Sequence, residues 1–368
     1  MKGFIPLFGT STRVKFGGNA KLDIIHDFQP AGEPNAFITS SIPTGNPIAA
    51  QNTSLSARQS KFNVEFRSPT RLGDLRVFYE NDFFDFNTGK TTFNLRHVYG
   101  QVWNVLAGFT YSTLLDPDAF PDTLDFEGPG SLVFVRQAQL RYTFGLFSGK
   151  RHTLAVAIEN GTSDVVLNIP GRPGSGAVTP TAPWPDFVVR YRYEAPTWHA
   201  QLGAVFRSVG GYVTDPNVDK HVLGTGFSLA GSVQLFGKDY VLFQGNYGRG
   251  MGRYIQDTQG LAPDVAVESN GDISANAAAG FYVSYQRYWL QTLRSTAVGG
   301  YAWVDSVGKT LTTEFNRSWY AAANLIYNPR STKFNIGIEY LWGQNQISTG
   351  AKGHANRVQI SFQYEFVL

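Results

Sequence analysis

The C-terminal residues alternate strictly between apolar and polar side chains. In the final stretch, RVQISFQYEFVL, the apolar positions from Val358 to Leu368 share one face and the polar positions from Gln359 to Glu365 share the other. Successive side chains of a strand point to opposite faces, so this period of two predicts a strand with one apolar and one polar face. No helical stripe of useful length is present. The same alternation recurs in FNVEF (62–66), LRVFY (75–79), LAVAIE (154–159), FVVRYRYE (187–194), WHAQLGAVF (198–206), FSLAGSVQL (227–235), FYVSY (281–285) and FNIGIEYLW (334–342).

Short and long connectors alternate as regularly as these strands. Seven short turns and eight long loops rich in Gly, Pro, Asn and Asp would join sixteen strands, with both chain ends on the short-turn side. This layout predicts an all-β fold: a 16-stranded antiparallel transmembrane β-barrel with long extracellular loops and short periplasmic turns. The barrel would occupy residues 12–368, after an N-terminal lead-in segment, residues 1–11. The short turns lie near 70–73, 103–104, 147–150, 194–197, 237–239, 287–290 and 328–332, and the long loops near 29–54, 81–92, 113–130, 160–186, 211–223, 250–272, 303–317 and 344–354.

A soluble β-sandwich or propeller would also contain many short strands and turns. Three features favour the membrane barrel instead. Charged residues recur on the faces opposite the apolar ones, and the chain ends on an alternating strand. Aromatic residues gather near strand ends, where they would form girdles at the lipid interfaces. These aromatic residues are Phe144, Phe187, Tyr193, Trp198, Trp319, Tyr327, Tyr340 and Trp342.

Composition agrees with export and argues against several other classes of protein. The 368 residues include no cysteine, which suits a compartment where thiols are oxidised. The net charge of +3 is small and the basic residues form no runs, so a nucleic-acid partner is not expected. No window approaches 18 consecutive apolar residues, and the start MKGFIPLFGT lacks the regions of a signal peptide. We therefore expect the mature or trimmed form of an exported protein.

The polar faces of the predicted strands carry more cations than acids. A basic side chain that points into lipid near the midplane costs roughly 2–4 kcal/mol, so the charged face must line the lumen. Some of these residues could instead pair along a strand, as Arg192 with Glu194 or Glu65 with Arg67. The predicted inward residues are twelve cations (Arg13, Lys15, Lys21, Lys61, Arg67, Arg76, Arg96, Arg141, Arg190, Arg192, Arg207 and Arg294) and six acids (Asp23, Glu65, Glu80, Glu159, Glu194 and Glu339).

The third long loop, TLLDPDAFPDTLDFEGPG (113–130), holds four aspartates, one glutamate and three prolines. In general diffusion porins the third loop folds into the barrel and narrows it. We predict a constriction loop that faces the basic wall and creates a transverse field, with its prolines limiting the backbone. An external acidic loop and a calcium site remain alternatives; the calcium pattern is weak because Phe120 stands at the next ligand position. The acids in question are Asp116, Asp118, Asp122, Asp125 and Glu127.

No catalytic, metal or cofactor site is predicted. No GxSxG stretch is present, and no histidine pair has metal-ligand spacing. The six histidines are scattered and lie beside no repeated Ser or Asp pattern. The many small inward residues suggest open space in the lumen rather than a plugged barrel; they are Gly108, Gly203, Ala278, Gly280, Gly300 and Gly337.

Several segments resemble the DcaP-like porins of Gram-negative outer membranes. The resemblance runs through PLFGTSTRVKFGGNAKLDIIHDF, LRHVYGQVWNVLAGFTYS, LDPDAFPDTLDFEGPG, VRQAQLRYTF and WLQTLRST, at intervals along the whole chain. It implies a homotrimeric outer-membrane channel that favours small negatively charged solutes, including dicarboxylates and aromatic acids. Family members can carry an N-terminal helical extension; because this sequence begins almost at the first strand, we expect that extension to be absent here or to have been cut off. The resemblance also implies solute-binding basic residues on the lumen wall. Those in resembling motifs are Arg13, Lys15, Arg96, Arg141 and Arg294, whereas Arg76, Arg190, Arg192 and Arg207 rest on the alternation alone.

Together these observations predict an outer-membrane porin for passive, anion-favouring diffusion, with no enzymatic activity. Outer-membrane lipid and lipopolysaccharide would surround it. A non-selective or cation-selective general porin is the alternative, and an outer-membrane hydrolase is a more distant one because no nucleophile–base pair is evident.

Overall fold

The structure of the chain is a computed structural model. The structure describes residues 3–45, 50–84, 91–147, 151–165, 178–213, 218–261, 263–267, 272–306, 314–329 and 332–367.

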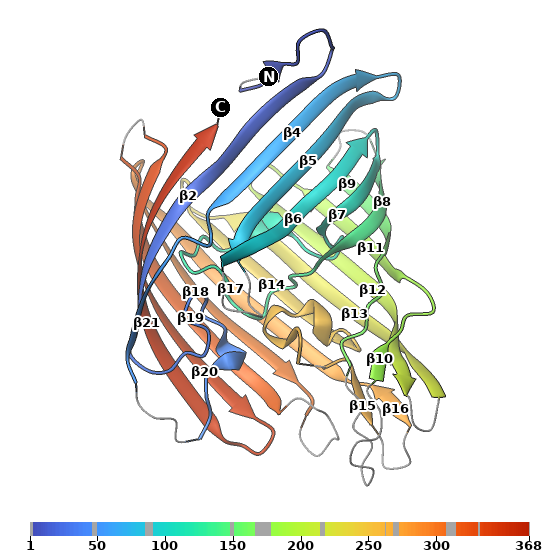
Figure 1. The fold of residues 1–368 in the computed structure, drawn as a ribbon, viewed down its shortest axis with the longest axis vertical. Helices are drawn as coiled ribbons and strands as arrows, with labels where there is room; N and C mark the ends of the chain where they lie inside the picture. The colour runs from blue at the N-terminus through green and yellow to red at the C-terminus, as the bar shows by residue number, and fades with distance from the viewer. Residues whose placement is uncertain are drawn as a thin grey trace.

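Nineteen strand segments form one closed antiparallel sheet (Figure 1). β3 and β4 both pair with β2, β10 and β11 both pair with β12, and β1 (Ile5–Pro6) adds only a short pairing beside β2. In the described part of the chain the wall therefore has sixteen strands, as predicted. They are β2 (Arg13–Asp27), β3 (Asn52–Ser56) continued by β4 (Lys61–Thr70), β5 (Gly73–Phe84), β6 (Thr91–Val102), β7 (Val105–Tyr111), β8 (Arg136–Leu146), β9 (His152–Glu159), β10 (Val178–Pro180) continued by β11 (Asp186–Glu194), β12 (Trp198–Val213), β13 (Val218–Gln234), β14 (Tyr240–Arg249), β17 (Ala277–Leu290), β18 (Leu293–Val304), β19 (Phe315–Tyr327), β20 (Phe334–Ile347) and β21 (Lys352–Val367).

The first and last wall strands close the barrel. β2 pairs with β21 from Gly17 opposite Val367 to Asp27 opposite Arg357. The N- and C-termini lie at the same end, where the short turns are, and the long loops are at the other end (Figure 1). No helix among the described residues is long and apolar enough to cross a membrane.

Side chains alternate between the two faces of the wall as the sequence pattern predicts. On β12, Leu202 and Phe206 are 55% and 42% exposed on the outer face, whereas Gln201 and Arg207 are 1% and 0% exposed on the inner face. A barrel surrounded by lipid shows this division between an apolar outside and a polar inside.

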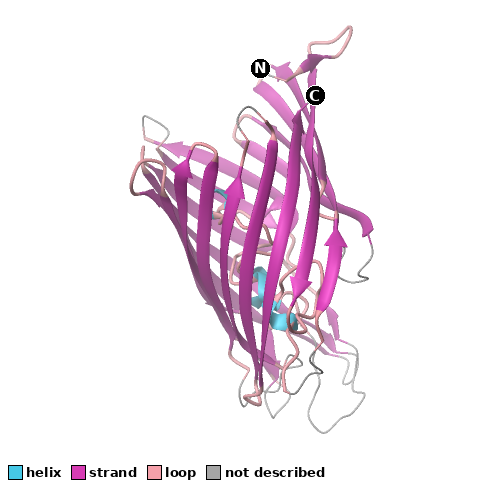
Figure 2. Cartoon of the chain, turned by 90° about the vertical axis from the view of Figure 1, so that its left-hand side faces the viewer, coloured by secondary structure: helices cyan, strands magenta, loops and turns pink. Residues whose placement is uncertain are grey.

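Three of the long loops pack inside the barrel. They are the first loop (residues 28–51), the third (112–135) and the sixth (250–276). Statements about these loops concern their described residues. They contain the short 3₁₀ helices η1 (Thr39–Ser41), η2 (Pro117–Ala119), η3 (Gly252–Tyr254) and η4 (Gln256–Thr258). Figure 2 shows short helices in the space that the strands enclose. The sixth loop also holds the hairpin strands β15 (Val265–Val267) and β16 (Ile273–Ala275).

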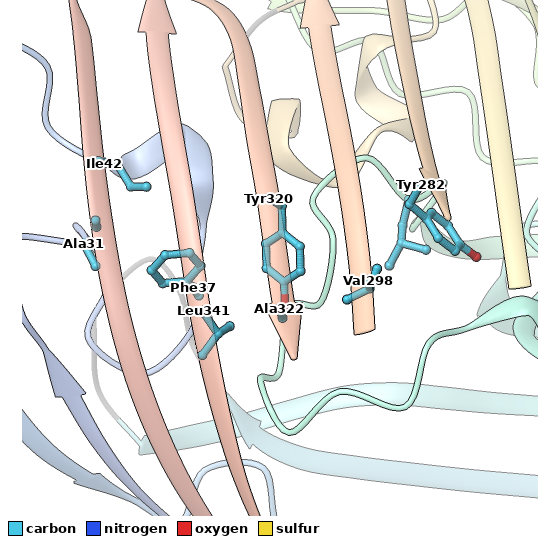
Figure 3. Packing of buried hydrophobic residues seen from close by; sticks show 10 residues of the cluster. Ala31, Phe37, Ile42, Tyr282, Val298, Tyr320, Ala322 and Leu341 are labelled. Atoms are coloured by element: carbon cyan, nitrogen blue, oxygen red, sulfur yellow. The ribbon is translucent and has the colours of Figure 1, made fainter. Parts of the chain in front are cut away.

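An apolar cluster joins the first loop to the inner wall. Phe37 and Ile42 are each 1% exposed and pack with Tyr320 of β19 and Leu341 of β20 (Figure 3). The opposite wall has a second cluster, in which Leu114 and Leu115 of the third loop pack with residues that include Met251 and Tyr254 of the sixth loop. The hydrophobic core of this protein thus lies inside the barrel, between loops and wall.

Gly18 is a wall position that leaves no room for a side chain. Its φ is +150°, and a Cβ there would lie 2.0 Å from the carbonyl oxygen of Lys61 on the neighbouring strand. We expect Gly18→Ala to lower the free energy of unfolding by at least ~1–3 kcal/mol, the usual cost of one strained backbone position. Denaturant unfolding in detergent, followed by tryptophan fluorescence, measures this change. Gly100→Ala is the control because a Cβ at Gly100 meets nothing within 4 Å; equal effects of both substitutions would contradict the prediction.

Candidate functional site

The third loop begins on the β11–β12 side of the interior with a group of charged contacts. Asp116 lies 2.8 Å from Nη1 of Arg192 and 2.8 Å from Nε2 of His199. The other terminal nitrogen of Arg192 lies 2.8 Å from Asp118. Asp116 also accepts a hydrogen bond from the backbone N–H of Asp118, which caps η2. The start of the loop is therefore held to the wall by ion pairs.

The loop then reaches the β18–β21 side. Glu339 of β20 accepts hydrogen bonds from the backbone N–H groups of Leu124 (3.0 Å) and Asp125 (2.7 Å). Arg294 of β18 is ion-paired with Asp122. β11 is the eighth wall strand and β20 the fifteenth, so these contacts lie on nearly opposite sides of a sixteen-stranded wall. The loop consequently crosses the interior of the barrel.

The five acids predicted for this loop have two kinds of surroundings. Asp116, Asp125 and Glu127 are 0%, 4% and 7% exposed, whereas the side chains of Asp118 and Asp122 are 64% and 33% exposed. Only the last two can present charge to the lumen. The other three are enclosed, so the predicted array of five acids facing an open eyelet is not what the contacts describe.

Burial sets the pKa values of the enclosed acids. It raises the pKa of Asp125, although Arg357 and the N–H groups of Phe37 and Gly128 oppose the rise. It raises the pKa of Glu127 well above its usual range, and the nearby Asp257 and Asp125 raise it further. For Asp116 burial also acts upward, but the hydrogen bond with His199 and the charge of Arg192 outweigh it and lower the pKa.

Several predicted lumen arginines are paired within the wall. Arg96 is 4% exposed and bonds to Glu80 (3.1 Å) and Asp82 (2.5 Å). Arg76 lies 3.1 Å from Glu65. A cation held by carboxylates of the wall contributes little net charge to the lumen.

Arg207 is enclosed completely. It is 0% exposed and lies 2.9 Å from Asp186 and 3.1 Å from Asp264 of the sixth loop. Its Nη1 also donates to the carbonyl oxygen of Gly250. Arg207 was expected on an open lumen wall, but a side chain with no exposed surface cannot contact a solute. The sequence pattern gave its inward direction and could not show that a distant loop covers it.

Two of the predicted arginines in the middle of the wall have no carboxylate within ion-pair distance in the described part of the chain. They are Arg141 of β8 and Arg190 of β11, and they flank β9, whose paired residues there are Ala157 and Ala155. The Nε atom of Arg190 is buried with no hydrogen-bond partner. The small alanines leave the two guanidinium groups without a bulky side chain between them.

The lysine and arginine of the N-terminal strand lie near the short-turn end. Arg13 is exposed, and Nζ of Lys15 lies 5.9 Å from the centroid of the Phe4 ring. Neither has a carboxylate within ion-pair distance among the described residues. They are therefore at one end of the barrel, away from the middle of the third loop.

Two cavities border the third loop. One, of about 260 Å³, is bounded by Lys21, Lys61 and Arg96 of the wall and by loop residues that include Glu127. The other, of about 490 Å³, is bounded by Arg136 and by parts of the first, third and sixth loops. Both share Phe126, Glu127 and Phe134. Arg136 was not among the predicted binding residues because the alternation along β8 assigns it to the face opposite Arg141, whereas at this end of the strand its side chain bounds the cavity.

The sixth loop is a part of this interior that the sequence did not indicate. It pairs with the third loop through a bridge between Val133 and Ile255 and through a hydrogen bond from Phe134 N–H to the carbonyl oxygen of Tyr254 (2.9 Å). Glycines make room for it: a Cβ at Gly226 would lie 2.6 Å from Sδ of Met251. Inward glycines such as Gly226 were the sequence feature that could have indicated a loop packed against the wall.

The expectation that small inward residues mark open space was wrong. A Cβ at Gly203 would lie 2.7 Å from Leu114, and one at Gly337 would lie 2.7 Å from Leu124. A Cβ at Gly280 would likewise lie 2.5 Å from the carbonyl oxygen of Ser131, and one at Gly300 would lie 2.9 Å from Pro129. These positions are small because the third loop packs onto them.

Two histidines each bridge a serine and an aspartate, an arrangement that the sequence did not indicate. His199 lies 2.8 Å from Ser232 Oγ and 2.8 Å from Asp116. His221 lies 3.3 Å from Ser208 Oγ and 2.8 Å from Asp219. The serines are only 9% and 2% exposed. Enclosed hydroxyls cannot meet a substrate, so both bridges are best understood as structural links.

Within the described ranges, no group of three or more His, Cys, Asp or Glu side chains could hold a metal ion.

Comparison with known proteins agrees with this fold. A family model described as DcaP outer membrane protein matches residues 4–366. The outer membrane channel DcaP of Acinetobacter baumannii is 20% identical, with a TM-score of 0.84 over 98% of this chain and 99% of that one. An anion-selective porin from Comamonas acidovorans is 11% identical (TM-score 0.59; 96% and 100% covered). The trimer form of OmpT from Vibrio cholerae is 10% identical (TM-score 0.55; 97% and 100% covered). No protein among the curated ones matches this sequence.

The buried carboxylates predict that the packing of the inner loops depends on pH. Because the pKa of Glu127 is raised in the folded protein, the folded state binds the carboxyl proton of Glu127 more tightly than the unfolded chain does. Its contribution is present at low pH and is lost as pH rises from the ordinary carboxyl range towards the raised pKa. We expect a lower free energy of unfolding at about pH 8 than at about pH 5, with a smaller difference in Glu127→Gln.

Denaturant titrations in detergent at both pH values measure this dependence. Asp74→Asn, which alters an exposed carboxylate beside the β4–β5 turn, is the control and should keep the full difference. An unchanged pH dependence in Glu127→Gln would show that this carboxyl group is not responsible.

Proposed function

The chain belongs to the DcaP outer membrane protein family and is a protein of the bacterial outer membrane, and from this premise we propose that it forms a passive pore favouring small negatively charged solutes. The proposal rests chiefly on one observation: Arg141 and Arg190 point inward and have no carboxylate partner within the described residues. A fixed cation in a confined, poorly screened space raises the local concentration of anions.

The proposed path runs past the third loop, which we propose is the constriction. An anion would enter the larger cavity beside Arg136, pass Phe126 and Phe134, and continue towards Arg141 and Arg190. Arg192 lies next to these two on the wall, but Asp116 and Asp118 already pair with it. Binding along the path should be weak, because a tight site would slow exit.

Dicarboxylates and aromatic acids are the solutes that we propose. Cations recur along the path, which suits an anion that carries two separated charges. Aromatic rings stand beside two of them: the guanidinium of Arg96 lies 5.5 Å from the Phe126 ring and that of Arg136 lies 5.6 Å from the Phe134 ring. A planar aromatic acid could contact a ring and a cation together.

We also propose a homotrimer, the assembly that is named for the Vibrio cholerae neighbour. Lipid and lipopolysaccharide would cover the remaining outer surface. The mass of the protein after mild detergent extraction tests the assembly, and a monomer under all extraction conditions would contradict it.

Neutralising the two unpaired arginines should weaken the preference for anions. At ~4 Å in water one unit charge changes the energy of a passing anion by about 1 kcal/mol, which corresponds to about fivefold in local concentration. We therefore expect Arg141→Gln and Arg190→Gln to shift the reversal potential under a salt gradient towards cations in planar bilayers. Arg71→Gln, at an exposed position of the β4–β5 turn, is the charge-matched control. Cation selectivity of the unaltered protein, or no conductance, would contradict the whole proposal.

The third loop is tested by Asp122→Asn. This substitution removes the carboxylate that pairs with Arg294 and leaves a cation facing the lumen. We expect a stronger preference for anions in the same bilayer measurement, because one negative charge is lost beside the path. Asp272→Asn, in the exposed part of the sixth loop, serves as the control. Unchanged conductance and selectivity in Asp122→Asn would argue that the loop does not control permeation.

A further inference from the structure

The outer face of β17, β18 and β19 carries a row of stacked aromatic side chains. The ring centroids of Phe281 and Tyr301 lie 5.4 Å apart, and those of Tyr301 and Trp319 lie 4.5 Å apart. These residues are opposite one another in the strand register and lie towards the long-loop end of their strands. Aromatic rows of this kind mark the level at which lipid acyl chains meet headgroups.

An apolar groove of about 470 Å³ lies on the same outer face, directly beyond this row towards the short-turn end. Its floor is formed by small residues on two neighbouring strands: Ala297 and Gly299 of β18 are opposite Ala323 and Ala321 of β19. Larger side chains on the flanking strands, including Val283 and Trp342, form its sides. The groove is a local depression in a face that elsewhere carries bulky apolar residues.

A cation stands on the other side of the aromatic row. Arg317 lies two residues before Trp319 on β19 and is opposite Trp303 of β18. It alternates with Ser318, whose hydroxyl bonds to Asp257 inside the barrel, so Arg317 belongs to the outer face. Its Nε donates a hydrogen bond to Asn316 Oδ1 (2.9 Å). The long loops are extracellular in such barrels, so Arg317 lies at the headgroup level of the outer leaflet.

The dimensions fit one leaflet of the membrane. Arg317 and Ala323 are six residues apart, which is roughly 20 Å along a strand that rises about 3.3 Å per residue. Strands of such barrels tilt by about 35–45°, so the distance along the membrane normal is roughly 15 Å. This is about half of the ~30 Å hydrocarbon core. A chain that starts near Arg317 and follows the groove would end near the midplane.

We propose that this groove binds one acyl chain of a phosphorylated lipid of the outer leaflet, with the lipid phosphate on Arg317. The argument for a lipid is the order of the features along one strand: a cation, an aromatic row and an apolar groove, which together span about one leaflet. Family membership places this face in the outer membrane, where acyl chains are the available apolar ligand. The guanidinium supplies the charge that complements a phosphate.

The test is lipid retention by the purified protein, counted by native mass spectrometry. The protein is delipidated in detergent and titrated with bisphosphorylated lipid A, phosphatidylglycerol or phosphatidylcholine. The double substitution Ala321→Leu and Ala323→Leu fills the groove and should abolish the tightest bound lipid. Arg317→Gln should weaken binding of the two anionic lipids, lipid A and phosphatidylglycerol, about fivefold, as expected for one cation near a lipid surface. Its effect on phosphatidylcholine should be smaller, because the choline cation of that lipid offsets the charge of its phosphate.

Two substitutions are matched controls. Ala204→Leu enlarges a small residue of β12 that is outward by the same alternation as Leu202 and Phe206, and Lys238→Gln removes an exposed cation at the β13–β14 turn, at the other membrane surface. Both should retain lipid as the unaltered protein does. Heat-dependent migration on a detergent gel verifies that each variant forms a barrel, and Arg317→Gln keeps the test available if the filled variant does not fold.

Each outcome decides the proposal. Tighter retention of lipid A than of phosphatidylglycerol identifies a lipopolysaccharide site, and the reverse identifies a phospholipid site. Equal retention by all variants would overturn the proposal, as would equal losses in the controls. If the filled variant keeps its lipid but forms smaller assemblies, the groove is a contact between copies of this chain, and the lipid proposal is wrong.

Discussion

The fold depends on one constraint: a sheet in lipid cannot leave backbone groups without hydrogen-bond partners. Lipid offers no donors or acceptors, so the first and last strands must pair with each other, as β2 and β21 do. Closure with sixteen strands encloses an interior that wall side chains alone cannot fill. The rest of the structure follows from how that interior is used. Loops enter it, bury their apolar residues there and leave limited space beside the wall.

The inner loops and the wall are complementary in shape and in charge. Inward glycines such as Gly203 and Gly337 leave space for leucines of the third loop. Wall carboxylates such as Glu339 accept hydrogen bonds from the loop backbone, because a loop that enters a barrel has lost its water and retains unpaired N–H groups. The acids of the third loop therefore act largely as anchors. An ion pair such as that of Asp116 with Arg192 fixes the position of the loop and at the same time neutralises a cation of the wall.

Electrostatic preference in such an interior depends on which charges remain unpaired. The excess of inward cations in the sequence is reduced by partners on the wall and on loops, for example Asp82 for Arg96 and Asp264 for Arg207. Arg141 and Arg190 differ because small alanines stand between them on β9. The unpaired charge on the inner face is thus set by a few guanidinium groups rather than by the total composition of the wall.

Local patterns along the chain were sufficient to predict the strands, their number, their inner and outer faces and the order of short turns and long loops. These features depend on local alternation and on turn-forming residues, which act over a few neighbouring positions. The sequence also indicated that the third loop enters the barrel, through the resemblance to porins. Which charges are paired could not be read from these patterns, because partners such as Arg207 and Asp264 are 57 residues apart and meet through folding of the sixth loop. For the same reason the sequence could not tell a glycine that lines open space from one that lies under a loop, as Gly337 does. Alternation states which way a side chain points, and long-range packing decides what it meets there.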